Sequence, residues 1–291
     1  MSIERVAVTG GNGTIGGAIL SELADRGYET VNVSRGDRSE SVADDYRSAD
    51  LVDAQATTDA LAASDADAVM HMGTIPSPVD HPGHVTFESN ALSAYHVLDA
   101  ATELGHEAVV LPSSINVMGA DYQDAPTEVS YLPVDEEHPL TPRDPYALGK
   151  QTTEALGEGF ARRPDTPQIA SLRYPWVATS DQLRSRFASQ ERSLASLGAN
   201  PTSRSTLFSY LHLADAASIA RRAIEADFDG HEAVWAVAAD TNTTVPSARL
   251  AETYYEDAPV RGDLGGYASL ISTEKARQLL DWTPEYSWRD L

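Results

Sequence analysis

Short apolar runs alternate with amphipathic stretches along the first half of the chain. The apolar runs contain valine or isoleucine and are short enough to be buried strands; they occupy residues 3–8, 29–33, 66–72, 107–111 and 168–173. Stretches with helical periodicity lie at residues 18–24, 57–63, 85–104 and 145–162, and a weaker strand ends just before Asp50. Because strand and helix alternate, the pattern predicts an α/β fold with a parallel sheet and helices on both faces.

The second half of the chain has a looser pattern. It predicts helices at 180–198, 214–227, 246–255 and 273–280, and a strand at 233–238. Residues 119–144 are rich in proline and acidic residues, and we expect them to form a loop over an active site. We therefore expect a doubly wound, Rossmann-like domain over residues 1–174. A small substrate-binding region at 175–291 would pack on the carboxyl ends of its strands, interleaved with it and not independent.

A glycine-rich turn stands between the first strand and the first helix. Gly10, Gly13 and Gly16 allow a tight turn, a close approach to a pyrophosphate and close packing of helix on strand. The start of the helix offers unpaired N–H groups and a partial positive charge. We expect these glycines, with Thr14 and Ile15, to bind the phosphates of a dinucleotide.

The end of the second strand bears on which dinucleotide binds. A carboxylate there would bind the 2′-hydroxyl of NAD, whereas an arginine nearby suits the 2′-phosphate of NADP. The chain has Ser34 and Arg35 at this place, with Arg38 beyond and Asp37 too late to take the carboxylate position. This favours NADP slightly and leaves NAD open, because Arg35 can also be an ordinary surface charge.

Tyr146 and Lys150 are the strongest catalytic candidates. They stand four residues apart on a predicted helix that Asp144 would cap, so they share one face. An ammonium beside a phenol lowers the pKa of the phenol and makes it a general base. The alternative is a surface ion pair between Lys150 and Glu154. Ser114, after a strand, is placed to hydrogen-bond the reacting oxygen or, alternatively, only backbone.

The amino-acid composition bears on the cellular environment of the protein and on which classes of molecule it can bind. The chain has 44 acidic and 21 basic residues, a net charge of -23, no cysteine, and only two lysines, at 150 and 275. This acidity is typical of proteins from a salt-rich cytoplasm and disfavours nucleic-acid and anionic-membrane partners. No apolar stretch has membrane-spanning length and no signal peptide is visible, so we expect a cytoplasmic protein. His81 and His84 lack a carboxylate at metal-ligand spacing, so we expect no metal.

Several motifs occur together in a fixed order. They are Thr9-Gly10-x-x-Gly13-x-x-Gly16, Asp50-Leu51, Asn90, Ser114–Gly119, Tyr146-x-x-x-Lys150, Tyr210–Asp215 and Leu280–Pro284. In this set the chain resembles, over nearly its whole length, the extended short-chain dehydrogenase/reductases. That is the NAD-dependent epimerase/dehydratase family, which includes UDP-glucose 4-epimerase. The resemblance implies nucleotide-dependent redox chemistry and a homodimer formed through the helices at 85–104 and 145–162.

The resemblance also implies individual roles. Tyr146 would be the catalytic acid/base, Ser114 the third catalytic residue, and Lys150 would lower the pKa of Tyr146 and hold the nicotinamide ribose. Further cofactor contacts would come from Asp50 and Leu51 at the adenine, Gly73 and Asn90 along the cofactor, and Tyr174 and Pro175 near the nicotinamide.

The chain departs from the sugar-nucleotide enzymes of the family. Phe208 stands where an arginine usually holds the diphosphate, and Met118 replaces a tyrosine. These differences favour a free sugar, a sugar phosphate or a uronic acid over a UDP-sugar. Arg173 would clamp a carboxylate or phosphate, or else be a buried structural arginine, and Asn116 and Trp176 would face the substrate. The alternatives are a UDP-glucose 4-epimerase-type enzyme and a non-catalytic dinucleotide sensor.

Overall fold

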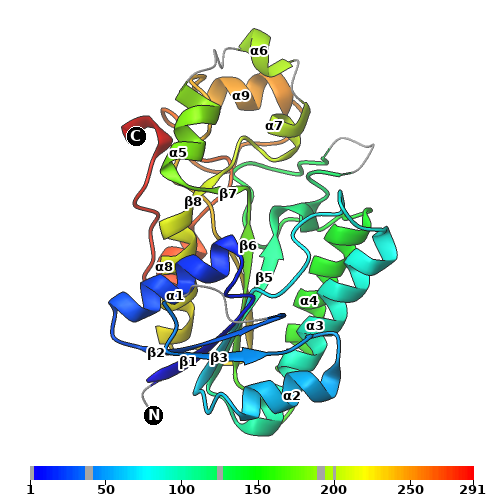
Figure 1. The fold of residues 1–291 in the computed structure, drawn as a ribbon. Helices are drawn as coiled ribbons and strands as arrows, with labels where there is room; N and C mark the ends of the chain where they lie inside the picture. Colours follow the sequence, from blue (N-terminus) through cyan, green and yellow to red (C-terminus); the bar gives the residue numbers. More distant parts are fainter. Residues whose placement is uncertain (1–2, 37–41, 123–126, 189–193, 199–200) are drawn as a thin grey trace.

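The computed structural model describes residues 3–36, 42–122, 127–188, 194–198 and 201–291. These residues contain a seven-stranded, all-parallel sheet (Figure 1), which confirms the expected Rossmann-like class. In spatial order its strands are β3 (Asp45–Ser48), β2 (Glu29–Ser34), β1 (Arg5–Thr9), β4 (Ala68–His71), β5 (Ala108–Ser114), β6 (Gln168–Tyr174) and β9 (His231–Trp235). The order reverses between β1 and β4, and this switch point is where such sheets bind ligands.

Helices cover both faces of the sheet. On one face α1 packs against α8, and on the other α3 packs against α2 and α4 (Figure 1). Their bounds are α1 Thr14–Asp25, α2 Ala54–Ala62, α3 Gly83–Leu104, α4 Pro145–Phe160 and α8 Leu213–Glu225. Because α8 and β9 belong to the second half of the chain, that half returns to the sheet. The division at residue 174 stays a prediction.

Alternating strand residues build a core on each face of the sheet. Val6 and Val8 join the cluster under α1 and α8, whereas Ala7 joins the one that includes Leu98 of α3 and Phe160 of α4. All three β1 residues are fully buried. A strand buried on both faces reads as a continuous apolar run, which explains why the pattern revealed it.

Most of the remaining elements gather beyond the carboxyl ends of the strands (Figure 1). They are η1 (Ile115–Met118), β7 (Val177–Ala178), α5 (Ser180–Leu183), η2 (Arg184–Ala188), α6 (Leu194–Gly198), α7 (Pro201–Ser205), β8 (Leu211–His212), α9 (Ser247–Tyr254) and η3 (Trp288–Asp290). Helix α10 (Glu274–Leu280) instead packs beside the sheet against α8 and β9. The single helix expected at 180–198 is therefore wrong: the described residues form short pieces, one of them a π turn.

The segment 119–144 is only partly the loop that we expected. Leu132 and Val134 are fully buried in a second core and form bridges with Val260 and Ile271. Only Asp121 and Tyr122, among its described residues, line the cavity discussed below. Part of this segment therefore belongs to the second core.

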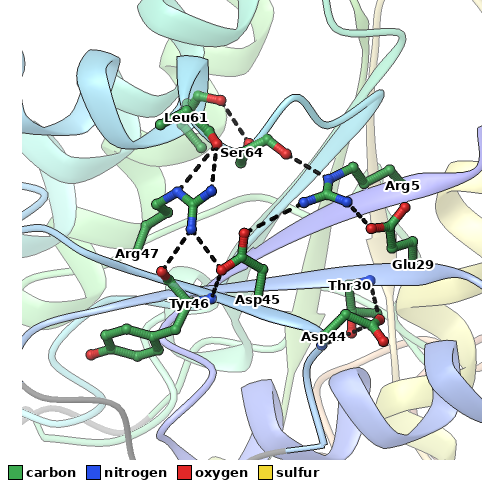
Figure 2. A network of polar contacts seen from close by, with 10 residues as sticks. Arg5, Glu29, Thr30, Asp44, Asp45, Tyr46, Arg47, Leu61 and Ser64 are labelled. Atoms are coloured by element: carbon green, nitrogen blue, oxygen red, sulfur yellow. Dashed lines mark hydrogen bonds and ion pairs between the residues drawn. The ribbon is translucent and has the colours of Figure 1, made fainter.

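The opposite edge of the sheet, where the strands begin, carries a network of paired charges (Figure 2). Asp45 accepts from Arg47 at 2.6 Å and lies 3.7 Å from Arg5, which also pairs with Glu29. Arg5 Nε donates to the carbonyl of Ser64 at 2.6 Å, at the end of α2. We call Arg5, Glu29, Asp45 and Arg47 the amino-edge network; it ties three strands to α2, far along the strands from the glycine turn.

Candidate active site

Two adjoining cavities open at the carboxyl ends of the strands. The larger, of about 680 Å³, is lined by Tyr146 and Lys150, and we call it the tyrosine cavity. The smaller, of about 550 Å³, is lined by Ser34 and is called the Ser34 cavity. Both are lined by Gly10 and Gly13 of the glycine turn, so an extended ligand can lie across the turn with one half in each cavity.

The glycine turn is shaped for a phosphate. Gly10 has a φ of +69°, and a Cβ added there would lie 2.6 Å from the backbone nitrogen of Gly73. A Cβ on Gly16 would lie 2.3 Å from the Gly10 carbonyl oxygen. The α1 helix starts after Gly13, and no described side chain caps it. Its first N–H groups are thus presented to the cavities, as pyrophosphate binding requires, and the chain's residues fit a dinucleotide there.

The Ser34 cavity is lined by the residues expected at the adenosine end, which are Ser34, Arg35, Asp50 and Leu51. Gly73, which we expected along the cofactor, also lines this cavity. The Ser34 hydroxyl donates to Asn32 Oδ1 at 2.8 Å, and Arg35 is exposed at the rim. Residues 37 and 38, which also entered the cofactor argument, lie outside the described residues.

The amino-terminal start of α4 brings Tyr146 into the tyrosine cavity. Asp144 caps the helix as expected, accepting from the N–H groups of Tyr146 and Ala147 at 2.9 and 3.0 Å. Tyr146 is 8% exposed, its phenol is hydrogen-bonded to Ser114, and the ring of Tyr122 stands edge-on to it. Burial raises the pKa of Tyr146 to about 12, although the hydrogen bond with Ser114 lowers it.

Lys150 is almost fully buried one turn further along α4. Its Nζ donates to Thr74 Oγ1 at 3.1 Å and lies 5.6 Å from the centre of the Tyr146 ring. Burial lowers the pKa of Lys150 to about 7. The alternative of an ion pair between Lys150 and Glu154 is wrong, because Glu154 bonds Arg173. In the chain itself, burial is the largest influence on the pKa of Tyr146 and raises it, and the lowering of that pKa by Lys150 stays a prediction.

Two predicted site residues lie outside the described lining of both cavities. Arg173 is 4% exposed and its guanidinium is held by Glu154, so the expected substrate clamp is wrong and the structural alternative holds. Asn90 is fully buried in α3, and its amide donates to the Ile75 carbonyl at 3.2 Å. Asn90 therefore supports the loop after β4 and does not line either cavity.

The lining of the tyrosine cavity includes several hydroxyl and amide groups. Asn116, Tyr174, Pro175 and Trp176 line this cavity, together with Gln182, Arg186, Thr202, Ser203, Thr206, Ser209 and Asn242. The guanidinium of Arg186 lies 4.6 Å from the ring of Trp176. We missed Thr74, Arg186 and the residues after 200. For the residues after 200, the one signal in the sequence is the high content of serine and threonine in 202–209.

The structure also bears on metals and membranes. No group of three or more histidine and acidic side chains in the described part of the chain is arranged to hold a metal ion. Within the same residues, no helix combines the length and the apolar character needed to cross a bilayer.

The sequence matches known proteins along most of its length. The family model of the NAD dependent epimerase/dehydratase family matches residues 6–238. A putative UDP-glucose 4-epimerase of Methanocaldococcus jannaschii is 29% identical over 51% of this chain, a match that spans about half (48%) of that protein's length. An L-arabinose 1-dehydrogenase (NAD(P)(+)) of Haloferax volcanii is 28% identical over 65% of this chain and 73% of its own.

Solved structures share the fold over almost the whole chain. MoeE5 in complex with UDP-glucuronic acid and NAD superimposes with a TM-score of 0.70 at 18% identity, covering 98% of this chain and 95% of its own. A mutated uronate dehydrogenase gives 0.69 at 22% identity, covering 99% of this chain and 85% of its own. At these identities the likeness shows the fold alone.

Proposed function

The chain belongs to the NAD dependent epimerase/dehydratase family, and we propose that it is an NAD(P)-dependent oxidoreductase that acts on a sugar or sugar derivative. One observation carries the proposal. Ser114, Tyr146 and Lys150 line a single cavity that adjoins the glycine turn. A redox site needs this arrangement, because the acid/base must stand beside the nicotinamide end of the cofactor.

The three side chains divide the work. When a nicotinamide is bound, it exchanges a hydride with the substrate carbon. Ser114 orients the substrate oxygen through its hydroxyl, and Tyr146 gives that oxygen a proton in reduction or takes one in oxidation. The raised pKa of Tyr146 keeps the phenol protonated, which suits the reduction direction. Oxidation requires a positive charge near the phenol, which a protonated Lys150 and the oxidised nicotinamide can provide.

The cavity wall favours a small sugar that carries one anionic group, such as a uronic acid or a sugar phosphate. Apart from Lys150, Arg186 is the one cation among the described lining residues, Asp121 is the one carboxylate, and the other lining residues are uncharged. Arg186 takes over the role that we assigned to Arg173. Phe208 is fully buried and offers no charge to a diphosphate. The alternatives are a UDP-sugar epimerase, which performs the same first half-reaction and then returns the hydride, and a non-catalytic sensor.

Three finer features belong to the proposal. Arg35 at the rim of the Ser34 cavity favours NADP, with NAD as the alternative. Phe87, Leu92 and Tyr95 of α3 and Leu148 of α4 are exposed apolar side chains, which supports a homodimer formed through these two helices. The net charge of -23 supports a salt-rich cytoplasm as the working environment.

An absorbance screen at molar salt tests the function. NAD and NADP are each crossed with neutral sugars, uronic acids, sugar phosphates and UDP-sugars, and reduced cofactor is measured. We expect reduced cofactor with an anionic monosaccharide. Conversion of UDP-galactose to UDP-glucose without reduced cofactor would replace the dehydrogenase by the epimerase.

Arg186→Met then tests the anionic substrate. We expect KM for that substrate to rise by about 10- to 100-fold, because a charge-assisted hydrogen bond is lost, while kcat changes little. Arg184→Met is the matched control, since Arg184 pairs with Asp181 on the surface. Equal KM values in the two variants would remove Arg186 from the site.

A further inference from the structure

A buried ion pair lies directly behind the catalytic residues. Glu154 stands on α4 one turn after Lys150 and two turns after Tyr146. Arg173 Nε and Nη2 donate to the two oxygens of Glu154 at 2.9 and 2.8 Å. The two side chains are 4% and 6% exposed, so the pair is a bidentate bond shielded from water.

The same carboxylate reaches a second strand. The hydroxyl of Ser113 on β5 donates to Glu154 Oε1 at 2.5 Å. In the sheet register Ser113 lies opposite Arg173, and the next pair along is Ser114 opposite Tyr174. Glu154 therefore fastens α4 to β5 and β6 at the residues that immediately precede Ser114 and Tyr174.

We propose that the Glu154–Arg173 pair, with Ser113, positions Tyr146 and Lys150 on α4 against Ser114 on β5. Glu154, Arg173 and Ser113 are positioning residues, because none of them carries the proton or the hydride. The inference rests on the proposed function for the meaning of the three catalytic residues. The inference goes beyond the proposed function because it assigns a positioning role to side chains that do not take part in the reaction.

Stability alone explains this pair poorly. A buried ion pair gains little over well-packed apolar side chains, because both charges lose their hydration. Here Arg173 Nη1 and the indole nitrogen of Trp235 are also buried without a hydrogen-bond partner among the described residues. The contacts of the pair instead fix the orientation of the Arg173 guanidinium. Its plane is held by the Glu154 carboxylate and by the ring of Trp235, whose centre lies 4.8 Å from the guanidinium carbon.

The two lysines of the chain make a direct test possible. Labelling lysine with ¹³C at Cε gives one NMR resonance from Lys150 and one from Lys275, and Lys275→Arg assigns them. In the wild type we expect Lys150 to titrate near the pKa of about 7 that its burial produces. The double variant Glu154→Gln/Arg173→Met removes both charges together, so a change at Lys150 reports geometry and hydration.

In the double variant we expect the pKa of Lys150 to rise by at least about one pH unit towards the ordinary value of about 10.4. We expect kcat to fall by about 10- to 100-fold with little change in KM, since a displacement of about 1 Å at the reacting groups costs that much. An unchanged Lys150 titration in a folded double variant would overturn the proposal. So would a kcat that stays at the wild-type value.

Two further variants keep the test decisive. Ser113→Ala removes one hydrogen bond and no charge, and we expect a two- to fivefold lower kcat; if the double variant does not fold, an unchanged kcat in Ser113→Ala overturns the proposal. Glu22→Gln/Arg221→Met removes another ion pair, 2.7 Å apart between α1 and α8 and less buried than Glu154–Arg173, and we expect it to leave the Lys150 titration unchanged. If the wild type reduces no cofactor, the proposed function fails, whereas the titration still tests the positioning.

Discussion

The two edges of the central sheet treat charge in opposite ways. At the amino edge, Arg5, Asp45 and Arg47 are partly exposed and pair with one another. At the carboxyl edge, Lys150 and Tyr146 are buried. Burial lowers the pKa of Lys150 and raises that of Tyr146, so it favours the neutral form of both side chains. Pairing at the surface costs the fold little, whereas a buried amine with one hydroxyl partner costs stability. The carboxyl edge is therefore where buried ionisable groups reduce the stability of the fold, and such groups with shifted pKa values are typical of catalytic sites.

The largest effect should come from Tyr146→Phe. The change keeps the ring and removes the one group that exchanges a proton with the substrate. We expect kcat to fall by about 10²- to 10⁴-fold, with cofactor affinity nearly unchanged. Tyr28→Phe is the control, because Tyr28 bonds Glu225 on the other face of the sheet. Full activity of Tyr146→Phe would leave the carboxyl edge without its proposed acid/base.

The next effect is on cofactor binding. A Cβ at Gly16 would meet the Gly10 carbonyl oxygen at 2.3 Å, so Gly16→Ala must distort the turn. We expect the Kd for reduced cofactor, measured by fluorescence titration, to rise by at least about tenfold, which is a loss of about 1.4 kcal/mol. Gly17→Ala is a neighbouring control, since its Cβ would be 3.4 Å from the Gly11 carbonyl oxygen. Equal affinities in both variants would contradict a phosphate site at the turn.

The buried amine should make stability depend on pH. Because the pKa of Lys150 is lowered to about 7 in the folded chain, the unfolded chain binds the extra proton between pH 7 and about 10. The free energy of unfolding should therefore gain up to about 1.4 kcal/mol per pH unit in that range from this group. Denaturant unfolding of the wild type and of Lys150→Met at pH 7 and 9 measures it. Equal gains in both proteins would show that Lys150 is not held neutral.

The smallest effect is expected at the amino edge. Asp45→Asn removes the central carboxylate of the amino-edge network. Because the pairs are partly exposed, we expect a loss of about 1 kcal/mol or less in the free energy of unfolding, shrinking further at molar salt, and no change in kcat. A change in kcat would mean that the two edges are not independent.

The sequence predicted the parts of the site that depend on local pattern. The glycine turn, the Asp144 cap and the shared face of Tyr146 and Lys150 all follow from spacing along one or two elements. The role of Arg173 stayed open between a substrate clamp and a structural arginine, because its partner, Glu154, lies on a distant helix and is visible only once α4 packs on β6. The substrate wall is built from short pieces whose order in space depends on tertiary packing. Spacing therefore did not reveal Arg186.

The central claim is that Tyr146 and its neighbours serve hydride transfer to a bound dinucleotide. Deuterium placed on the oxidised carbon of whichever sugar is turned over tests it most directly, with mass spectrometry of the cofactor and the product. We predict that the deuterium is recovered in the reduced nicotinamide from the wild type, and that Tyr146→Phe gives almost none. Deuterium lost to water from a sugar that the protein converts would contradict hydride transfer.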